Sequence, residues 1–195
     1  MWSKAKPPLA LPDQNLLSDH IYMRPAKLQD WPEWVVVREE NREHLQPFEP
    51  KWGENCFEEE FFARRLKRQA REWHLGQAQA FLIFDRDTDA LIGGMNINNI
   101  CRGAAQFCSL GYWIAKDREG RGLMREALKL TIAYCFKELK LHRINCSCLL
   151  HNTRSKSLLL AAGFQEEGMA EHYLQINGQW QDHLLFGLPV ELWKT

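Results

Sequence analysis

The sequence lacks the features that mark a membrane-spanning, secreted or uniformly basic protein. Its longest apolar runs, such as Phe81–Phe84, are far shorter than the roughly 18 to 20 residues that cross a bilayer, and no apolar signal region opens the chain. The 25 basic and 25 acidic residues cancel, so contact with nucleic acid would need a local patch of charge. We therefore expect a cytoplasmic protein without membrane contact.

Paired cysteines and metal-ligand spacings are missing as well. The six cysteines include no C-x-x-C pair, and the neighbouring thiols Cys146 and Cys148 have no second half of His or Cys at ligand spacing. The chain also has no His-Glu-x-x-His, Gly-x-Ser-x-Gly or EF-hand pattern. These absences predict buried, reduced cysteines and no metal, and they exclude metalloprotease and nucleophile-elbow hydrolase functions.

What the chain does contain is typical of one globular domain. It has 195 residues, of which 45% are hydrophobic, 11% aromatic and 26% charged. A chain of this size buries about 70% of its extended surface around a single core. Pro7, Pro8 and Pro12 interrupt a start with few periodic apolar positions. We therefore expect an N-terminal arm over residues 1–17 and a single domain over residues 18–195.

Hydrophobic periodicity predicts a mixed α/β (α+β) chain in the order β-α-α-β-β-β-α-β-α-β-β. Asn177-Gly178 is the strongest short hairpin signal, and Asn152 and Gly163 are typical of the start and end of a helix. The predicted strands cover residues 20–24, 80–86, 90–97, 106–115, 142–150, 173–176 and 180–188. The predicted helices cover residues 27–45, 57–73, 123–139 and 152–162.

The loop over residues 119–124, between a predicted strand and a predicted helix, is the clearest candidate for chemistry. Gly120 and Gly122 let a pyrophosphate approach free amides at the helix start, and four cations surround it: Lys116, Arg118, Arg121 and Arg125. The loop is no Walker A motif, which needs Lys and Ser or Thr directly after Gly122. It is no dinucleotide fingerprint either, because Arg125 occupies the position of the third glycine. A tight turn without a ligand explains the two glycines equally well.

Several motifs, in the right order and spacing, resemble the GNAT superfamily of N-acetyltransferases: Leu110-Gly111-Tyr112-Trp113-Ile114, Gly120-Arg121-Gly122-Leu123-Met124-x-Glu126-Ala127, His142-Arg143-Ile144, Asn152-x-x-Ser155 and Gly163-Phe164. Others resemble the members that acetylate the N-terminal alanine of a small-subunit ribosomal protein: Glu40-Asn41-Arg42-x-x-Leu45-x-Pro47-x-Glu49-Pro50, His151-Asn152-x-Arg154-Ser155 and Asn177-Gly178-Gln179-Trp180-x-Asp182-His183. The resemblance covers about residues 18–190.

The resemblance implies the GNAT fold, a mixed and mostly antiparallel sheet with flanking helices. Acetyl-CoA would lie in a V-shaped splay between the neighbouring strands that end near Ile114 and Leu150. Ser155 would protonate or hydrogen-bond the leaving thiolate, although Asn152 and Ser155 are also ordinary residues for the start of a helix. The cofactor-binding residues that the resemblance implies are Tyr112, Trp113, Ile114, Glu119, Gly120, Arg121, Gly122, Leu123, Met124, Asn152 and Ser155.

The sequence departs from the family pattern at three positions. Glu119 stands where Gln or Arg is usual, Met124 replaces a small residue, and Leu159 stands where many relatives have a tyrosine acid. The last departure leaves Ser155 or an ordered water to protonate the sulfur. The candidates for deprotonating the amine are, in order of preference, Glu49, His151, Glu171 and His172. Glu49 would equally well hold the ammonium of the substrate before reaction.

The function we expect is direct acetyl transfer from acetyl-CoA to the N-terminal alanine of a ribosomal protein, with Ser155 and Glu49 as catalytic residues. One alternative keeps the fold but acetylates a small amine. Another is a non-catalytic RNA-binding or ribosome-binding module that uses the basic helix face over Arg64–Arg71. That face is also what an ordinary solvated helix presents.

Overall fold

The computed structural model describes residues 10–194. The first nine residues of the expected arm lie outside the described residues. Further along the arm, Leu16–Leu17 form a short strand, β1, which pairs with the next strand. The division of the chain at residues 17 and 18 stays a prediction.

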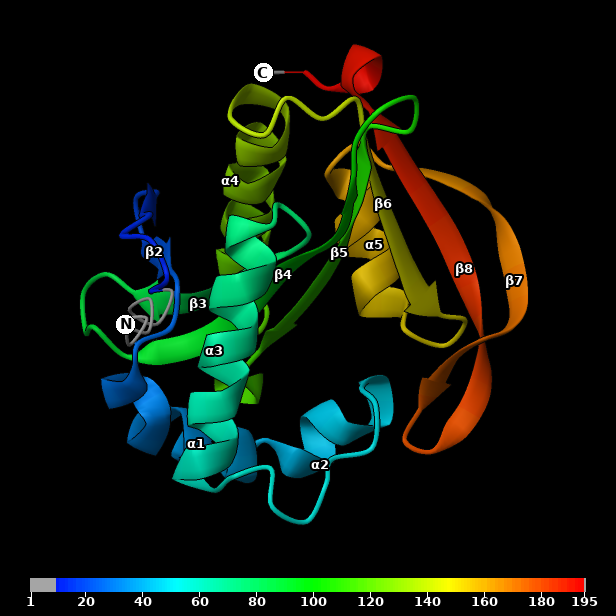
Figure 1. Ribbon diagram of the computed structural model, residues 1–195. Helices are drawn as coiled ribbons and strands as arrows, with labels where there is room; N and C mark the ends of the chain where they lie inside the picture. Colours follow the sequence, from blue (N-terminus) through cyan, green and yellow to red (C-terminus); the bar gives the residue numbers. More distant parts are fainter. Residues whose placement is uncertain (1–9, 195) are drawn as a thin grey trace, which may run out of the picture.

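Residues 10–194 form one eight-stranded sheet in the order β1-β2-β3-β4-β5-β6-β8-β7 (Figure 1). Every neighbouring pair is antiparallel except β5 and β6, which are parallel. The sheet is therefore mixed and mostly antiparallel, as the sequence predicts. The remaining strands are β2 (Ile21–Arg24), β3 (Gln79–Asp85), β4 (Leu91–Cys101), β5 (Phe107–Ile114), β6 (Arg143–Leu149), β7 (Gln165–Ile176) and β8 (Gln179–Pro189).

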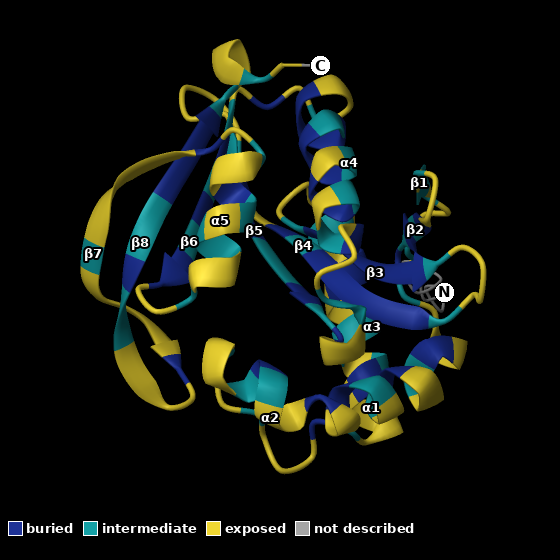
Figure 2. Ribbon diagram, turned by 180° about the vertical axis from the view of Figure 1, so that it is seen from behind, coloured by how far each residue is buried: buried dark blue, intermediate teal, exposed yellow. Residues whose placement is uncertain are grey.

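Helices cover both faces of the sheet (Figures 1 and 2). Alternate residues of β3 belong to two cores, because successive side chains of a strand point to opposite faces. Phe81 and Ile83 share a core with residues of α4 (Leu123–Lys137) and α5 (Thr153–Ala161). Leu82 and Phe84 share the other with residues of α1 (Trp31–Glu40), α2 (Arg42–Leu45) and α3 (Glu59–His74), although Trp73 at the end of α3 packs on Phe81. Among residues 10–194, none of the helices combines the length and apolarity that a membrane crossing requires.

The predicted helix over residues 27–45 is wrong as one element. The chain instead forms a 3-10 turn at Leu28–Asp30, then α1, and then the short α2. The break falls at Asn41, whose side-chain amide donates to the carbonyl of Val37 and whose Oδ1 accepts from the amide of Lys116. A short polar side chain that bonds the backbone in this way competes with helix continuation.

The last predicted hairpin is correct at its turn but too short in its first strand. β7 begins at Gln165 rather than at residue 173, and its pairing with β8 shifts twice, near Gly168 and between Ala170 and Leu174. Such bulges break the alternation of apolar and polar residues on which a strand prediction depends. The strand is the exposed outer edge of the sheet (Figure 2).

The parallel pair β5 and β6 separates soon after it forms. Only three residue pairs are in register, Phe107 with Arg143, Cys108 with Ile144 and Ser109 with Asn145. Beyond them β5 continues to Ile114 while β6 stays paired with β8, and the two strands move apart (Figure 1). The V-shaped splay that the resemblance implies is confirmed.

A pH-dependent link joins the loop before β2 to the first turn of α4. His20 Nδ1 lies 2.8 Å from Glu126 Oε1, and the Ser18 hydroxyl donates to the other carboxylate oxygen at 2.8 Å. The hydrogen bond with Glu126 raises the pKa of His20. At Glu126, burial raises the pKa of the carboxyl group, but hydrogen bonds from Ser18 and His20 lower it. The net result is a lowered pKa.

Replacing His20 with glutamine is therefore expected to lower the melting temperature in a pH-dependent way. The stability from His20 is present below its unfolded pKa of about 6.5 and is lost as the pH rises through the raised folded value. Glu126 contributes above its unfolded pKa of about 4.3, so both terms act at about pH 5.5. Thermal unfolding should show a larger deficit there than at about pH 8.5. An equal deficit at both pH values would contradict this account.

Candidate functional site

A cavity of about 660 Å³ opens where β5 and β6 separate. Four parts of the chain build its wall: the α2 region, the end of β5, the glycine loop with the start of α4, and the start of α5. The lining residues are His44, Leu45, Phe48, Glu49, Tyr112, Trp113, Ile114, Arg118, Glu119, Gly120, Gly122, Leu123, Met124, Arg125, Asn152, Arg154, Ser155 and Leu158.

The glycine loop gives the cavity an anion-binding wall. Gly120 and Gly122 have φ of +72° and +81°, values that L side chains rarely adopt, and α4 begins directly after Gly122. The first amides of a helix have no partners within it, and the helix dipole adds positive potential there. Arg118 and Arg125 line the same wall, although the Arg118 guanidinium pairs with Asp85 at 3.0 Å and with Asp117 at 3.2 Å. The loop is therefore suited to hold a phosphate group.

Glu119, at the start of this loop, lies between Arg154 and His44. Its carboxylate forms a salt bridge with Arg154 of α5, and His44 Nε2 lies 3.4 Å from its other oxygen. The residue thus connects the loop to both the α2 region and α5. The sequence offers only its departure from the family pattern as a signal, and no indication of these partners.

Two residues of the cavity wall bring their hydroxyl groups together. The Tyr112 hydroxyl lies 2.8 Å from Ser155 Oγ, and the Ser155 amide donates to Asn152 Oδ1 at 3.1 Å. This last contact confirms Asn152 as the cap of α5. Burial raises the pKa of Tyr112 well above its usual range, so this hydroxyl stays protonated. Leu159, at the position where the resemblance leads one to expect a tyrosine acid, is fully buried and apolar.

Glu49 lies in the wall on the α2 side and pairs, from a half-buried position, with a buried arginine. Arg38, which is 8% exposed, donates to both of its oxygens, and Trp52 Nε1 donates to Oε2 at 2.8 Å. The Arg38 guanidinium also lies 4.2 Å from the ring centre of Trp52 and 4.9 Å from that of Trp113. The amide of Asn177 donates to the Glu49 carbonyl at 2.8 Å, which ties the loop to the β7–β8 hairpin.

Comparison with known proteins identifies the family. Residues 20–165 match the model described as the acetyltransferase (GNAT) domain. This chain belongs to the GNAT acetyltransferases. Its fold and its acyltransferase class are those that the motifs predict.

Three relatives show how far the similarity of this GNAT acetyltransferase extends. The chain is 37% identical to the [ribosomal protein uS5]-alanine N-acetyltransferase of Escherichia coli, with 94% of each chain covered. It resembles the crystal structure of the ribosomal-protein-S5-alanine acetyltransferase of Vibrio fischeri, with 33% identity, a TM-score of 0.85, and 94% and 100% of the two chains covered. It also resembles Mycobacterium smegmatis RimJ in complex with CoA-disulfide, with 30% identity, a TM-score of 0.83, and 88% and 82% covered.

Most of the residues predicted for the site of this GNAT acetyltransferase lie together in the cavity wall. Those brought together are Glu49, Tyr112, Trp113, Ile114, Glu119, Gly120, Gly122, Leu123, Met124, Asn152 and Ser155. Their roles stay predictions. Arg121 is exposed and outside the lining, although it lies in the glycine loop.

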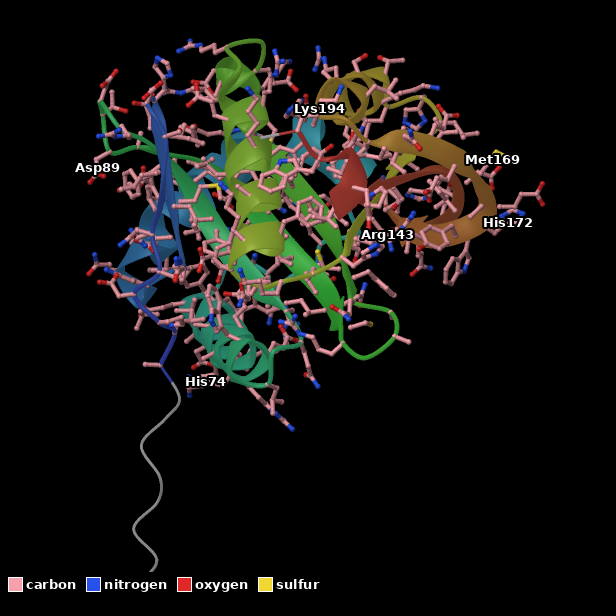
Figure 3. The ribbon with its side chains drawn as sticks, turned by 90° about the horizontal axis from the view of Figure 1, so that it is seen from above. His74, Asp89, Arg143, Met169, His172 and Lys194 are labelled. Atoms are coloured by element: carbon pink, nitrogen blue, oxygen red, sulfur yellow. The ribbon has the colours of Figure 1, made fainter. Side chains whose placement is uncertain are left out.

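The other candidate bases lie outside the lining. His151 packs against Phe48, with ring centres 5.9 Å apart. Glu171 and His172 are exposed on β7, and Figure 3 shows His172 at the outer rim of the molecule. Sequence reasoning missed four lining residues: His44, Leu45, Arg154 and Leu158. The sequence does hold a signal for Arg154, because this residue stands next to Ser155 in one of the motifs that carry the resemblance.

The basic face of α3 is partly neutralised by the helix itself. Arg64 pairs with Glu60 at 3.5 Å and Arg68 with Glu72 at 3.7 Å. Arg65 turns inward, with its guanidinium 5.3 Å from the ring centre of Trp34. These contacts use charges that an RNA-binding surface on this helix would need.

Among residues 10–194, no group of His, Cys, Asp and Glu side chains is arranged to hold a metal ion.

Proposed function

We propose that this chain transfers the acetyl group of acetyl-CoA to the free α-amino group of an N-terminal alanine on a small-subunit ribosomal protein in the cytoplasm. The names of its relatives from E. coli and V. fischeri support this acceptor, and the coenzyme A compound bound to the M. smegmatis protein supports the donor. The observation that carries the proposal is that the glycine loop, the Tyr112–Ser155 pair and Glu49 line one cavity at the strand splay.

The donor half of the cavity offers partners for two parts of acetyl-CoA, its pyrophosphate and its pantetheine. The amides of Gly120–Met124 would hold the pyrophosphate, with Arg125 adding positive charge. The free edge of β5, from Tyr112 to Ile114, would pair with the amide groups of pantetheine, because β6 has moved away from it. Acetyl-CoA supplies the activated acetyl thioester. The residues of this chain align it and leave its carbonyl carbon open to the amine.

The reaction needs a neutral amine and a stabilised leaving thiolate. An α-amino group with a pKa near 8 is about one-tenth neutral at pH 7, far more than a lysine near 10.4, so an N-terminal acceptor needs little basic help. Its nitrogen bonds to the acetyl carbon, the carbon–sulfur bond breaks, and the nitrogen loses a proton to solvent. The Ser155 hydroxyl protonates or hydrogen-bonds the sulfur, while Tyr112 fixes its orientation.

Glu49 is better placed to hold the acceptor than to take its proton. Both oxygens already accept hydrogen bonds, from Arg38 and Trp52. Of the roughly four acceptor sites of a carboxylate, one remains, on Oε1, for an ammonium or amine at the cavity wall. We therefore assign to Glu49 the role of positioning the α-amino group. Water accepts the proton that the amine loses.

The test uses purified protein, acetyl-CoA and three matched peptides. The first begins with free alanine, the second with blocked alanine, and the third is blocked and carries one internal lysine. Mass spectrometry and thiol release should show transfer to the first peptide alone. Transfer to polyamines with none to peptides would favour the small-amine alternative. Salt-sensitive RNA binding without any transfer would favour the binding module.

A further inference from the structure

A second, smaller cavity lies between α3 and β4, on the face of the sheet that α1–α3 cover. Its volume is about 160 Å³. Ala78 and Ala80 leave room on the sheet side, and long polar side chains form the rest of the wall. The full lining is Arg65, Arg68, Gln69, Glu72, Ala78, Gln79, Ala80, Asn96 and Asn98. We call it the α3–β4 cavity.

Arg65 brings a positive charge to this cavity that no carboxylate of the wall pairs, because Glu72, the acidic residue of the lining, pairs with Arg68 at 3.7 Å. It is mostly buried, and within residues 10–194 it forms no salt bridge, whereas its neighbour Arg38 is paired with Glu49. Burial and the repulsion of Arg38 and Arg68 lower the pKa of Arg65 to about 10. A carboxylate in the cavity would relieve both the desolvation and the repulsion.

Gln69 brings to the cavity wall a buried acceptor oxygen that has no hydrogen-bond donor. Its side chain faces the sheet from α3, is 8% exposed, and its Oε1 has no partner. Asn96 and Asn98 add two amide groups to the same wall. A group that fits must therefore combine an anion with N–H donors nearby, as an acidic residue in a peptide does.

The position of the α3–β4 cavity connects it to the active site. Asn96 lies opposite Gly111 in the β4–β5 register. Trp113, which lines the active-site cavity, follows Gly111 two residues later, about 7 Å along the strand.

Arg38, which pairs with Glu49, and Arg65 both approach the ring of Trp34, with guanidinium carbons 5.8 Å and 5.3 Å from its centre. An extended acceptor chain advances roughly 3.4 Å per residue from Glu49, so the second to sixth positions are the ones to test.

We propose that the α3–β4 cavity binds the carboxylate side chain of an acidic residue near the N-terminus of the acceptor, with Arg65 as its partner. This inference rests on the proposed function and adds a determinant of acceptor choice to it. Gln69 and the two asparagines bond the adjoining peptide groups. The cavity is too small for a folded element or a nucleotide, and it admits one side chain.

The test scans one glutamate through the second to sixth positions of peptides that begin with alanine, each compared with its glutamine counterpart. One position should give a kcat/KM about tenfold higher with glutamate, and the preference should shrink in high salt. Arg65→Met should abolish it without changing the KM for acetyl-CoA. Arg71→Met, on the exposed side of α3, is the matched control and should retain it.

The absence of a preferred position, or a preference that survives in Arg65→Met, would overturn the inference. A binding assay separates this failure from failure of the proposed function. It measures how the same peptides, labelled at their C-terminus, bind to the protein loaded with coenzyme A. Transfer without glutamate preference refutes only the acidic subsite. The opposite outcome is binding that depends on glutamate and is abolished by Arg65→Met, while no peptide is acetylated. That outcome refutes only the proposed function.

Discussion

Replacing Ser155 with alanine is expected to lower kcat about a hundredfold, the effect of losing a positioned proton donor. The serine hydroxyl lies in the cavity wall and hydrogen-bonds Tyr112, and the apolar Leu159 offers no substitute. Asn152 and the glycine loop remain in place, so the KM for acetyl-CoA should change little. Steady-state kinetics with the alanine peptide measure both constants.

Tyr112 should act through Ser155, and a double-mutant cycle tests this. Tyr112→Phe keeps the buried ring but removes the hydroxyl that orients the serine, so kcat should fall by a smaller factor than in Ser155→Ala. Adding Tyr112→Phe to Ser155→Ala should cost nothing further. Tyr173→Phe, on the exposed β7, is the control. Wild-type kcat in Ser155→Ala, or losses that multiply, would contradict the account.

The second large effect is on stability. Glu49→Ala is expected to lower the free energy of unfolding by about 3 kcal/mol, because it leaves the buried Arg38 guanidinium without its carboxylate. For a chain of this length that corresponds to a fall of roughly 6 to 12 °C in melting temperature. The loop would also lose its hydrogen bond from Trp52. Thermal and urea unfolding measure the change.

Two further variants show whether the lost pair is the cause. Glu43→Ala removes an exposed carboxylate from neighbouring α2 and should leave the melting temperature unchanged. Arg38→Met combined with Glu49→Met removes both charges and should recover most of the lost stability, as apolar replacements of buried pairs commonly do. A Glu49→Ala protein as stable as wild type would show that the pair does not hold this loop.

The elements that the sequence predicts well have local causes. Gly122 needs a positive φ before α4, Asn152 caps α5 with its own side chain, and Asn177-Gly178 makes a tight turn. Each of these signals lies within a few residues of the structure that it specifies. The helix over residues 27–45 fails because Asn41 bonds to Lys116, a partner 75 residues away that no local pattern reveals.

The site follows the same division. The glycine loop and the Asn152 cap are visible as motifs, whereas the contact between Tyr112 and Ser155 joins residues 43 positions apart. The sequence predicts Tyr112 as a cofactor-binding residue on the strand beside the cofactor, but it gives no sign of the hydroxyl contact, which forms only once β5 and α5 pack together. Arg38 was missed altogether because an arginine in a helix gives no sign that it will be buried between two indoles.

The most direct test of the central claim is a crystal structure of the protein with coenzyme A. We expect the pyrophosphate on the amides of Gly120–Met124, pantetheine along β5 in the splay, and the sulfur within hydrogen-bond distance of Ser155 Oγ. Coenzyme A bound outside the cavity, or with its sulfur remote from Ser155, would contradict the assignment of the glycine loop and the Tyr112–Ser155 pair to acetyl transfer.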